Sequence, residues 1–457
     1  MLKLSQAATA LAADMPGHDA TFTGVTADSR AINSGDLFVA LRGKRFDAHD
    51  FVAQAIAQGA AAALVERSAA MKHAADWQGL PLIVVDDTRL ALGKLAAFWR
   101  SRLNLKLVAI TGSNGKTTVK EMLAAILREA AGEGAVLATQ GNLNNDIGMP
   151  LTLLKLRAQH KYAVIEMGMN HPGEIAYLSH IARPDVAVIN NAGAAHLAGL
   201  GSVEQVARAK GEIFSGLAPD GVAVINADDA FAPLWKELAL GHAVIGFGLE
   251  QASQVSATCR LTPLGSELQV TTSAGEFTAS LQVPGLHNAR NALAATAAAV
   301  ALGIGLAAIA AGLGTFGGVK GRLQRRAGLH GAMLIDDSYN ANPASVEAAI
   351  AVLARMPGRK ILVLGDMGEL GPGACELHRE LGAAAKQAGV DILFAHGDLC
   401  REAAAAFGKN AWFFERIEEL LADLENLLAP DVTVLVKGSR FMQMERVVKS
   451  FEVKSNG

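Results

Sequence analysis

A glycine-rich segment, Thr111-Gly-Ser-Asn-Gly-Lys-Thr-Thr118, is the part of the sequence best suited to bind a phosphate group. It lies between a predicted strand that ends at Ile110 and a predicted helix that begins near Thr117. Backbone N–H groups of such a loop surround phosphate oxygens, its lysine reaches the β- and γ-phosphates, and the following hydroxyl holds Mg²⁺. The residues predicted to bind ATP are Gly112, Ser113, Asn114, Gly115, Lys116, Thr117 and Thr118.

The segment departs from the standard phosphate loop at one position. The standard pattern requires glycine at position 110, where this chain has Ile110. An ordinary glycine turn before a helix is the alternative interpretation. We favour the phosphate loop because Gly-Lys-Thr-Thr stands between a strand and a helix, as the motif requires.

Glu166 and His196 follow two consecutive buried strands of the predicted sheet. Because parallel strands present their carboxyl ends at one edge, we expect both side chains to emerge beside the phosphate loop. Taken alone, Glu166 could instead cap a helix, and His196 could be an ordinary loop histidine.

The elements that position these residues are predicted to form a parallel, doubly wound sheet. Buried apolar runs alternate with helical segments and predict five strands, at residues 105–110, 162–167, 185–190, 221–226 and 243–247. Residues 254–284 change to a period of two, which predicts an antiparallel flap on this domain.

Two further α/β units flank this domain. Short apolar runs between residues 22 and 85 indicate a small N-terminal α/β domain. A second βαβ series after residue 332 predicts a Rossmann-like C-terminal domain, preceded by a glycine-rich linker at residues 315–322. We expect an α/β protein of three domains, at residues 1–84, 85–316 and 317–457.

Residues 291–319 carry no charged side chain and are long enough to cross a bilayer. They consist mostly of Ala and Gly, and Gly303 and Gly305 interrupt them, so their insertion energy would be poor. We therefore predict a buried helix pair and no membrane association.

The composition limits the classes of binding partner and the cellular compartment that we expect. A chain of 457 residues with a net charge of −3 has no basic field that would attract nucleic acid. Its three cysteines are far apart and not in metal-ligand spacing, which favours reduced thiols. The N-terminus has only a short, interrupted apolar run, so we expect a cytoplasmic protein with small-molecule substrates.

The form Thr-Gly-x-x-Gly-Lys-Thr-Thr resembles the phosphate loop of the Mur ligases and of the related folylpolyglutamate ligases. The resemblance extends over essentially the whole chain. It implies that Glu166 and His196 bind Mg²⁺, and that Lys210, in Arg208-Ala-Lys-Gly-Glu-Ile213, becomes carbamylated and supports a second Mg²⁺ ion. A solvated surface lysine is the alternative for Lys210.

The same resemblance implies further nucleotide contacts. Asn291, in Leu286-His-Asn-Ala-Arg-Asn-Ala292, matches an adenine-side residue of the family, and Asn288 matches less well. A helix N-terminus capped by Asn288 is the alternative. Arg322 and Asp337 match positions that contact ATP across the domain cleft.

Longer strings resemble the branch of the Mur ligases that adds D-alanyl-D-alanine. The most diagnostic are Asp336-Asp-Ser-Tyr-Asn-Ala-Asn-Pro343 and Leu364-Gly-Asp-Met-Gly-Glu-Leu-Gly371. The implied contacts to the UDP-sugar are Ser29, Arg30, Phe46, Asp47 and His49. Those to the muramyl substrate are Asn142, Asn144 and Asn145, and those to the dipeptide are Asn340, Asn342 and Lys437. Plain polar turns are the alternative at each of these places.

The resemblance implies an ATP-dependent, ADP-forming ligase that joins D-alanyl-D-alanine to a UDP-muramyl tripeptide through an acyl phosphate, acting as a monomer. Lys116, His196 and Lys210 would be its catalytic residues. A folylpolyglutamate-type ligase and a nucleotide-switch ATPase that performs no ligation are the rival functions. The sequence leaves open whether the third peptide residue is meso-diaminopimelate or lysine.

Overall fold

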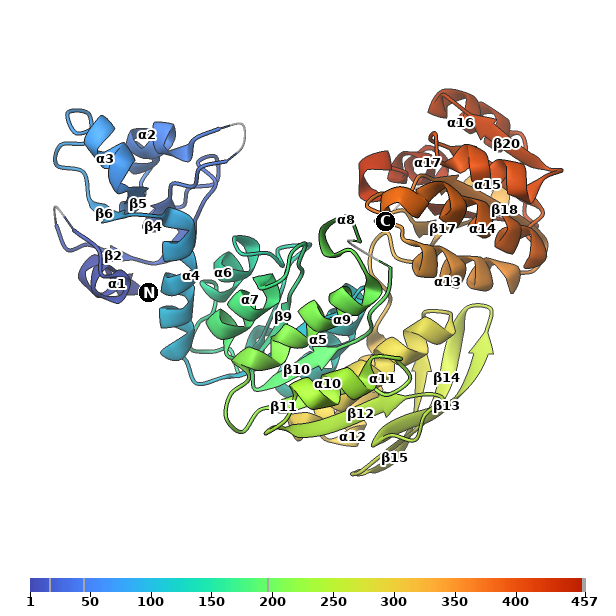
Figure 1. The fold of residues 1–457 in the computed structure, drawn as a ribbon, viewed down its shortest axis with the longest axis horizontal. Helices are drawn as coiled ribbons and strands as arrows, with labels where there is room; N and C mark the ends of the chain where they lie inside the picture. Colours follow the sequence, from blue (N-terminus) through green and yellow to red (C-terminus); the bar gives the residue numbers. More distant parts are fainter. Residues whose placement is uncertain (16–17, 44–45, 195–196, 454–457) are drawn as a thin grey trace.

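The computed structural model describes residues 1–15, 18–43, 46–194 and 197–453. Three α/β parts follow one another along the chain and are coloured blue, green to yellow, and orange to red in Figure 1. The central part lies between the other two (Figure 1). The predicted three-part α/β architecture is confirmed.

The N-terminal part contains a four-stranded parallel sheet in the order β3-β4-β5-β6. Its strands are β3 (Gly24–Thr26), β4 (Asp36–Val39), β5 (Ala62–Glu66) and β6 (Leu82–Val85). Its helices are α1 (Leu4–Leu11), α2 (Val52–Ala57) and α3 (Arg67–Lys72), and the short strands β1 (Leu2–Lys3) and β2 (Thr21–Phe22) pair beside it.

A nine-stranded sheet forms the central part, in the order β15-β14-β13-β12-β11-β10-β7-β9-β8. The parallel strands are β7 (Lys106–Thr111), β8 (Val136–Ala138), β9 (Tyr162–Glu166), β10 (Val186–Ile189), β11 (Val222–Asn226) and β12 (Ala243–Gly248). The predicted flap consists of β13 (Val255–Thr262), β14 (Gly265–Thr272) and β15 (Gly275–Leu281). It extends the same sheet, because β13 pairs with β12.

Helices cover both faces of this sheet (Figure 1). The helices of this part are α5 (Lys116–Ala131), α6 (Gly148–Leu153), α7 (Glu174–Ala182), α8 (Leu197–Leu200), α9 (Val203–Gly211), α10 (Ala232–Leu238), α11 (Leu286–Ala301) and α12 (Leu306–Thr315). From β7 the chain first forms β8 and β9 on one side and then β10 on the other. This reversal is a topological switch point, where open α/β sheets bind ligands.

The C-terminal part has a six-stranded sheet in the order β16-β17-β21-β18-β19-β20. Its strands are β16 (Gln324–Ala327), β17 (Met333–Asp337), β18 (Arg359–Gly365), β19 (Ile392–His396), β20 (Ala411–Phe414) and β21 (Val432–Lys437). Its helices are α13 (Pro343–Ala354), α14 (Ala374–Gln387), α15 (Cys400–Phe407), α16 (Ile417–Glu425) and α17 (Glu445–Phe451).

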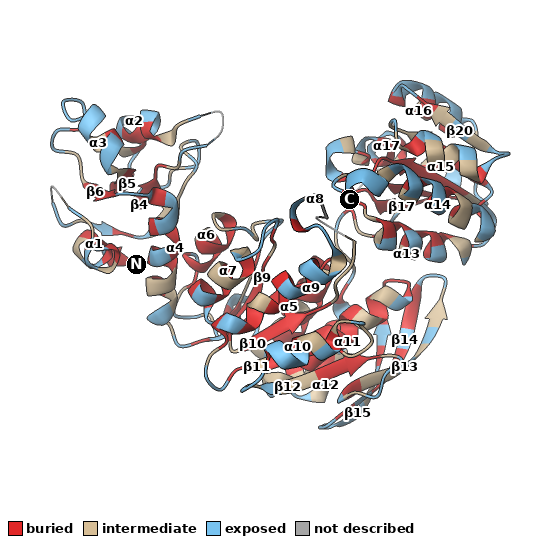
Figure 2. Cartoon of the chain, in the orientation of Figure 1, coloured by how far each residue is buried: buried red, intermediate tan, exposed pale blue. Residues whose placement is uncertain are grey.

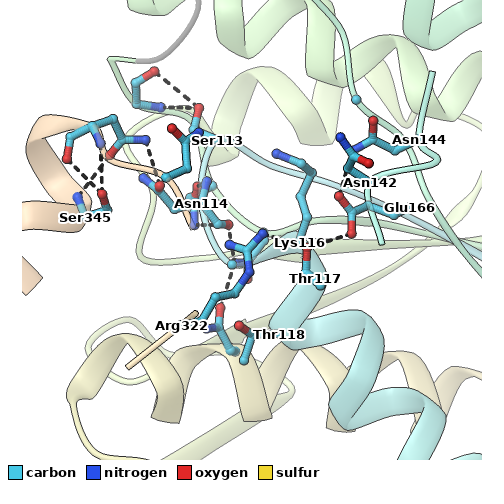
Figure 3. A pocket seen from close by; sticks show the side chains of 18 of the residues that line it. Ser113, Asn114, Lys116, Thr117, Thr118, Asn142, Asn144, Glu166, Arg322 and Ser345 are labelled. Atoms are coloured by element: carbon cyan, nitrogen blue, oxygen red, sulfur yellow. Dashed lines mark hydrogen bonds between the residues drawn. The ribbon is translucent and has the colours of Figure 1, made fainter. Parts of the chain in front are cut away.

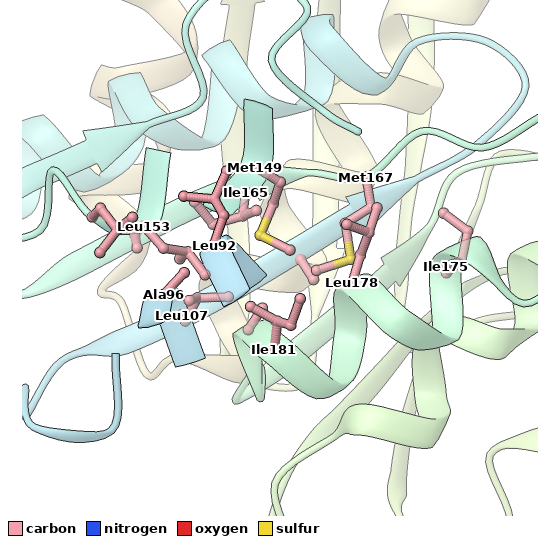
Figure 4. Close-up of a cluster of buried hydrophobic side chains, with 14 of the residues drawn as sticks. Leu92, Ala96, Leu107, Met149, Leu153, Ile165, Met167, Ile175, Leu178 and Ile181 are labelled. Atoms are coloured by element: carbon pink, nitrogen blue, oxygen red, sulfur yellow. The ribbon is translucent and has the colours of Figure 1, made fainter. Parts of the chain in front are cut away.

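One long helix, α4 (Thr88–Ser101), joins the first two parts. Asp87 caps its N-terminus by accepting the backbone N–H groups of Arg89 and Leu90. Leu92 and Ala96 on its buried face pack against the central sheet and its helices, as Figure 4 shows. The same apolar cluster contains N-terminal core residues such as Phe22, so the two parts share one core.

Burial follows the expected layers. Strands β7, β9, β10 and β11 at the middle of the central sheet are mostly buried, whereas much of the flap and the outer faces of the helices are exposed (Figure 2). The uncharged segment forms α11 and α12, and both pack against α5. This confirms the predicted helix pair, and among the described residues no helix is long and apolar enough to span a membrane.

The exact domain limits remain a proposal. We place the first boundary between residues 84 and 85, just before the last residue of β6, although the core continues through α4. We place the second at residues 316 and 317, because α12 ends at Thr315 and the described core clusters of the C-terminal part begin at Leu323.

Gly312 on α12 tests the packing of this helix pair. A Cβ at Gly312 would lie 2.4 Å from Ile126 Cα on α5, so Gly312→Ala forces the helices apart. We expect urea denaturation to show a loss of about 1–3 kcal/mol in the stability of the central domain. The control is Gly314→Ala in the same helix, where the nearest atom lies 4.0 Å away. Equal stability of the two variants would contradict the packing described here.

Candidate functional site

The phosphate loop turns sharply between β7 and α5. Gly115 precedes the helix with a φ of +79°, a conformation that L side chains rarely adopt. A Cβ there would lie 2.3 Å from Asn291 Oδ1 and 2.4 Å from Asn190 Nδ2. Glycine is therefore required for both conformation and space, which gives the sequence motif a local physical reason.

Lys116 begins α5, and its side chain folds back over the loop. Its Nζ donates a hydrogen bond to Gly112 O at 2.6 Å. Burial lowers the pKa of the Lys116 ammonium, Glu166 counteracts this shift, and the charge of Arg322 adds to it. The lysine is thus held at the loop without a carboxylate bonded directly to its ammonium group.

Glu166 lies beside the loop because β9 pairs with β7 in parallel, with Glu166 opposite Ile110. Thr117 Oγ1 donates to Glu166 Oε2 at 2.9 Å, and Asn144 Nδ2 donates to Glu166 Oε1 at 2.8 Å. Figure 3 shows these side chains converging near Lys116. Glu166 does not cap a helix, so that alternative is excluded by its position at the end of β9.

Asparagine side chains support the phosphate loop from behind. Asn190 Nδ2 donates to Asn114 O at 2.9 Å and to Asn291 Oδ1 at 2.8 Å. Asn191 Oδ1 accepts the backbone N–H of Asn114 at 2.8 Å. Asn288 does not cap α11 at its N-terminus, since its Nδ2 donates to Pro284 O at 2.8 Å.

Lys210 lies near the end of α9 and is only 2% exposed. The alternative of a solvated surface lysine is therefore wrong. Burial lowers the pKa of the Lys210 amine well below its usual range, and the charge of Lys116 lowers it further. Its predicted companion His196 lies outside the described residues.

Two side chains of the C-terminal part reach the phosphate loop. Arg322 Nη2 donates to Thr117 Oγ1 at 3.0 Å, and Asn342 Nδ2 donates to Asn114 Oδ1 at 2.8 Å. The Arg322 guanidinium also lies 4.4 Å from the ring centroid of Tyr339, within the range of a cation–π interaction. These contacts bring the two domains together across the site.

Asp337 and Lys437 form a buried pair at the ends of β17 and β21. Lys437 Nζ lies 2.5 Å from Asp337 Oδ2 and donates to Asn340 O at 3.0 Å. The second oxygen of Asp337 accepts the backbone N–H of Leu323 at 3.1 Å. The pair thus fixes the segment that carries Asn340 and the segment that follows Arg322.

A cleft of about 1030 Å³ unites these groups. The predicted site residues that line it are Ser113, Asn114, Gly115, Lys116, Thr117, Thr118, Asn142, Asn144, Asn145, Glu166, Asn291, Arg322, Asp337, Asn340, Asn342 and Lys437. Gly112 and Lys210 lie behind this surface, since both are buried and neither is part of the described lining.

The predicted UDP-sugar residues lie apart from this cleft, whose described lining begins at Asp87. Phe46 is 75% exposed, and Arg30 is exposed and pairs with Asp28 at 2.9 Å. Ser29 is half-buried.

His49 has a different environment from the other UDP-sugar candidates. It is buried, its Nδ1 lies 2.6 Å from Asp47 Oδ1, and its Nε2 accepts the N–H of Glu66 at 3.0 Å. Because both ring nitrogens are bonded within the domain, His49 is placed to orient Asp47.

Sequence reasoning missed several cleft residues. Asn190 directly follows β10, so the strand-end rule that selected Glu166 could have selected it too. Arg89 on α4 also lines the cleft and forms a two-pronged pair with Asp146, with Arg89 Nη2 at 2.7 Å from Asp146 Oδ1. No motif joins these two, because 57 residues separate them in the chain.

A second cluster of metal-ligand types, Asp366, His378 and Cys400, is buried in the C-terminal part. The backbone N–H of Met367 donates to His378 Nε2 at 3.0 Å, so the ring proton is on Nδ1, which donates to Ala374 O at 2.7 Å. His378 therefore has no free lone pair for a metal. The cluster instead holds the loop that follows β18.

Three family models match the chain in series. They are the Mur ligase family catalytic domain over residues 21–100, the Mur ligase middle domain over residues 110–299, and the Mur ligase glutamate ligase domain over residues 321–440. The matched segments follow the three α/β parts of the fold.

Individual relatives match over nearly the whole chain. The UDP-N-acetylmuramoyl-tripeptide–D-alanyl-D-alanine ligase of Escherichia coli (strain K12) is 45% identical, covering 98% of each chain. A crystal structure of MurF from Acinetobacter baumannii matches with a TM-score of 0.89 and 39% identity, covering 98% of this chain and 97% of the other.

A crystal structure of MurF ligase from Thermotoga maritima in complex with ADP matches with a TM-score of 0.81 and 30% identity. It covers 93% of this chain and 96% of the other. Because the family models and these relatives together span all three parts in order, the chain belongs to the Mur ligase family.

Proposed function

We propose that this enzyme uses ATP to join D-alanyl-D-alanine to a UDP-N-acetylmuramoyl-tripeptide, a step in the synthesis of peptidoglycan precursors. The observation that carries the proposal is the single cleft in which the phosphate loop, the Asn142–Asn145 loop and the Asn340–Asn342 segment meet. ATP and the two other substrates react with one another, so all three must bind in one cleft. The 45% identity to the Escherichia coli ligase supports the same substrates.

ATP binds with its phosphates at the N-terminus of α5. The backbone N–H groups of the loop and the helix dipole favour negative charge there. Gly112, Ser113, Asn114, Gly115 and Thr118 form this part of the site, and Asn291 orients the adenine side. Arg322 and Asp337 close it from the C-terminal domain, supported by the contact between Arg322 and Thr117.

The first chemical step is phosphoryl transfer. An oxygen of the tripeptide's terminal carboxylate attacks the γ-phosphorus, the bond to the β-phosphate oxygen breaks, and ADP and an acyl phosphate result. Lys116 offsets the charge that builds on the phosphate oxygens during this transfer. Positioning supplies most of the acceleration, so the C-terminal domain must stay close to the loop.

The second step forms the amide bond. The free amine of D-alanyl-D-alanine attacks the carbonyl carbon of the acyl phosphate, loses a proton, and gives a tetrahedral intermediate that expels phosphate. Asn340, Asn342 and Lys437 are the residues we assign to the dipeptide. Asn342 is suited to this because it already faces Asn114 across the cleft.

The oxygen donors of Thr117 and Glu166 fit Mg²⁺, which prefers hydroxyl and carboxylate ligands. Thr117 Oγ1 and Glu166 Oε2 lie 2.9 Å apart, so both atoms could contact one ion. Bound Mg²⁺ would withdraw charge from the phosphates. We assign one ion to Thr117 and Glu166, and a second to His196 and a carbamate on Lys210.

The environment of Lys210 supports the proposed carbamylation. CO₂ reacts with a neutral amine, giving a carbamate and releasing a proton. Burial and Lys116 both lower the pKa of Lys210, which favours the neutral amine. The anionic carbamate oxygen would then pair with positive charge, whereas an ammonium group would be repelled.

The remaining assignments concern the UDP-linked substrate. Phe46 offers an exposed aromatic face for stacking on a base, and Arg30 offers an exposed guanidinium for phosphate. Ser29 and Asp47 supply further polar contacts, with Asp47 oriented by His49. Asn142, Asn144 and Asn145 line the cleft, and we assign them to the muramyl peptide.

We propose that the enzyme acts as a monomer in the cytoplasm. One chain supplies all the groups of the cleft, and its three cysteines are free. A folylpolyglutamate-type ligase is disfavoured because the C-terminal string Asp336-Asp-Ser-Tyr-Asn-Ala-Asn-Pro343 lies at this cleft. A switch ATPase that performs no ligation would bind no dipeptide, so it would not need the Asn340–Asn342 segment at the cleft.

Incubation of the purified protein with ATP, D-alanyl-D-alanine and each UDP-muramyl tripeptide tests the function. Mass spectrometry should detect the pentapeptide product, and phosphate release should require both the dipeptide and the tripeptide. Lys116→Ala should reduce turnover by about 10²–10³-fold with the fold intact. The control is Lys155→Ala, an exposed lysine. Phosphate release without either cosubstrate would favour a switch ATPase.

Carbamylation of Lys210 has its own test. Activity should fall in CO₂-depleted buffer and return when bicarbonate is added. Lys210→Arg should stay inactive under both conditions, because arginine remains protonated and forms no carbamate. Full activity of Lys210→Arg, measured as phosphate release, would return this residue to a purely structural role.

A further inference from the structure

Lys120 is a buried cation for which the proposed chemistry has no use. It lies on α5 one turn after Lys116 and is 1% exposed. Burying an ammonium group costs free energy unless its protons are bonded. The position of this lysine therefore depends on the groups that accept those protons.

Two acceptors surround the Lys120 ammonium. Its Nζ donates to Thr139 O at 2.5 Å and lies 2.8 Å from Glu121 Oε1. Thr139 immediately follows β8 and is itself buried. The lysine thus ties the helix of the phosphate loop to the segment that leads into the Asn142–Asn145 loop.

The bonds of Thr139 continue to Glu166. Thr139 Oγ1 accepts the backbone N–H of Glu166 at 3.0 Å. Glu166 in turn accepts from Thr117 Oγ1, which lies on α5 three residues before Lys120. The bonds therefore form a closed circuit that starts and ends on the same helix and joins it to the ends of β8 and β9.

We propose that Lys120 is a positioning residue that holds Glu166, and the start of the asparagine loop, in register with the phosphate loop. This rests on the function proposed above. Lys120 acts through Thr139 and touches neither nucleotide nor peptide. Because Glu166 Oε1 also accepts from Asn144, displacement of Glu166 reaches the loop assigned to the muramyl substrate.

A purely stabilising role accounts poorly for this arrangement. Removing one partner of an ion pair is costly when the other charge stays buried. The Glu121 side chain is 33% exposed, so its carboxylate would keep contact with water when Lys120 is replaced. The contribution of Lys120 is directional, since it fixes one carbonyl oxygen at the end of a strand. Its loss should change the site more than the stability of the domain.

Lys120→Met tests the proposal in the full-length protein, because it keeps most of the volume and removes the donor. In the absence of ligand, the amide of Glu166 should exchange its hydrogen at least tenfold faster than in the wild type. Half-saturation of a non-hydrolysable ATP analogue should need about 10–100-fold more Mg²⁺, the range seen when groups that orient metal ligands are lost.

Three control variants separate positioning from stability. Lys155→Met removes an exposed lysine whose Nζ donates to Gln140 Oε1 at 3.2 Å, next to Thr139, and should change neither readout. Leu127→Ala creates a cavity in the same helix and should lower stability without raising the Mg²⁺ requirement. Thr139→Val removes the acceptor for Glu166 and should reproduce the faster exchange.

The outcomes are distinct. Wild-type exchange and Mg²⁺ requirement in Lys120→Met, or the same changes in Leu127→Ala, would overturn the positioning role. If Lys120→Met does not fold, unchanged exchange in Thr139→Val overturns it instead. Failure of the wild-type protein to bind the ATP analogue at any Mg²⁺ concentration would refute the proposed function, independently of Lys120.

Discussion

The parallel register of β7, β9 and β10 is the constraint on which the site depends. Backbone hydrogen bonds align Ile110 with Glu166 and Thr111 with Ile189. A shift by one residue would turn every side chain of a strand to the opposite face and out of the close packing that it has with the helices on its own side. The three strand ends are therefore fixed relative to one another, and the polar residues that follow them meet at one place.

Charged side chains lie close together around the strand ends that form the site. Lys116 and Arg322 bring positive charge to a region that also contains the buried Lys210 amine, and Glu166 is the carboxylate that influences Lys116. The lowered pKa values of the two lysines reflect both their burial and the proximity of other cations. An anionic ligand such as a polyphosphate relieves this repulsion, so electrostatics favour occupation of the cleft.

Much of the fold could be predicted from sequence because hydrophobic periodicity is a local signal. The strands that contain long apolar runs, such as β7 and β9, lie close to their predicted limits. Short edge strands were missed, among them β8 (three residues) and β16 (four residues), because so few residues show no clear period. The flap was predicted as antiparallel, but its continuity with β12 depends on two paired residues in each strand.

The site residues also fall into two groups: those that a local sequence signal marks, and those that only the fold brings together. The phosphate loop and Glu166 could be predicted because a motif and a strand end mark them in the sequence. The burial of Lys210 could not, since a single lysine in a helical segment carries no sign of what packs over it. The pair Arg89–Asp146 and the contact of Asn342 with Asn114 join residues that are far apart in the chain, and only the fold brings them together.

The shared core of the first two domains has a consequence for how the molecule loses its structure. The apolar cluster that contains Leu92 and Ala96 of α4 includes side chains of both the N-terminal and the central domain. The described core clusters of the C-terminal domain contain only residues from Leu323 onward. Heat should therefore melt the N-terminal and central domains together, in one cooperative transition. The C-terminal domain is free to melt in another, and a nucleotide that bridges the cleft would draw the two transitions towards the same temperature.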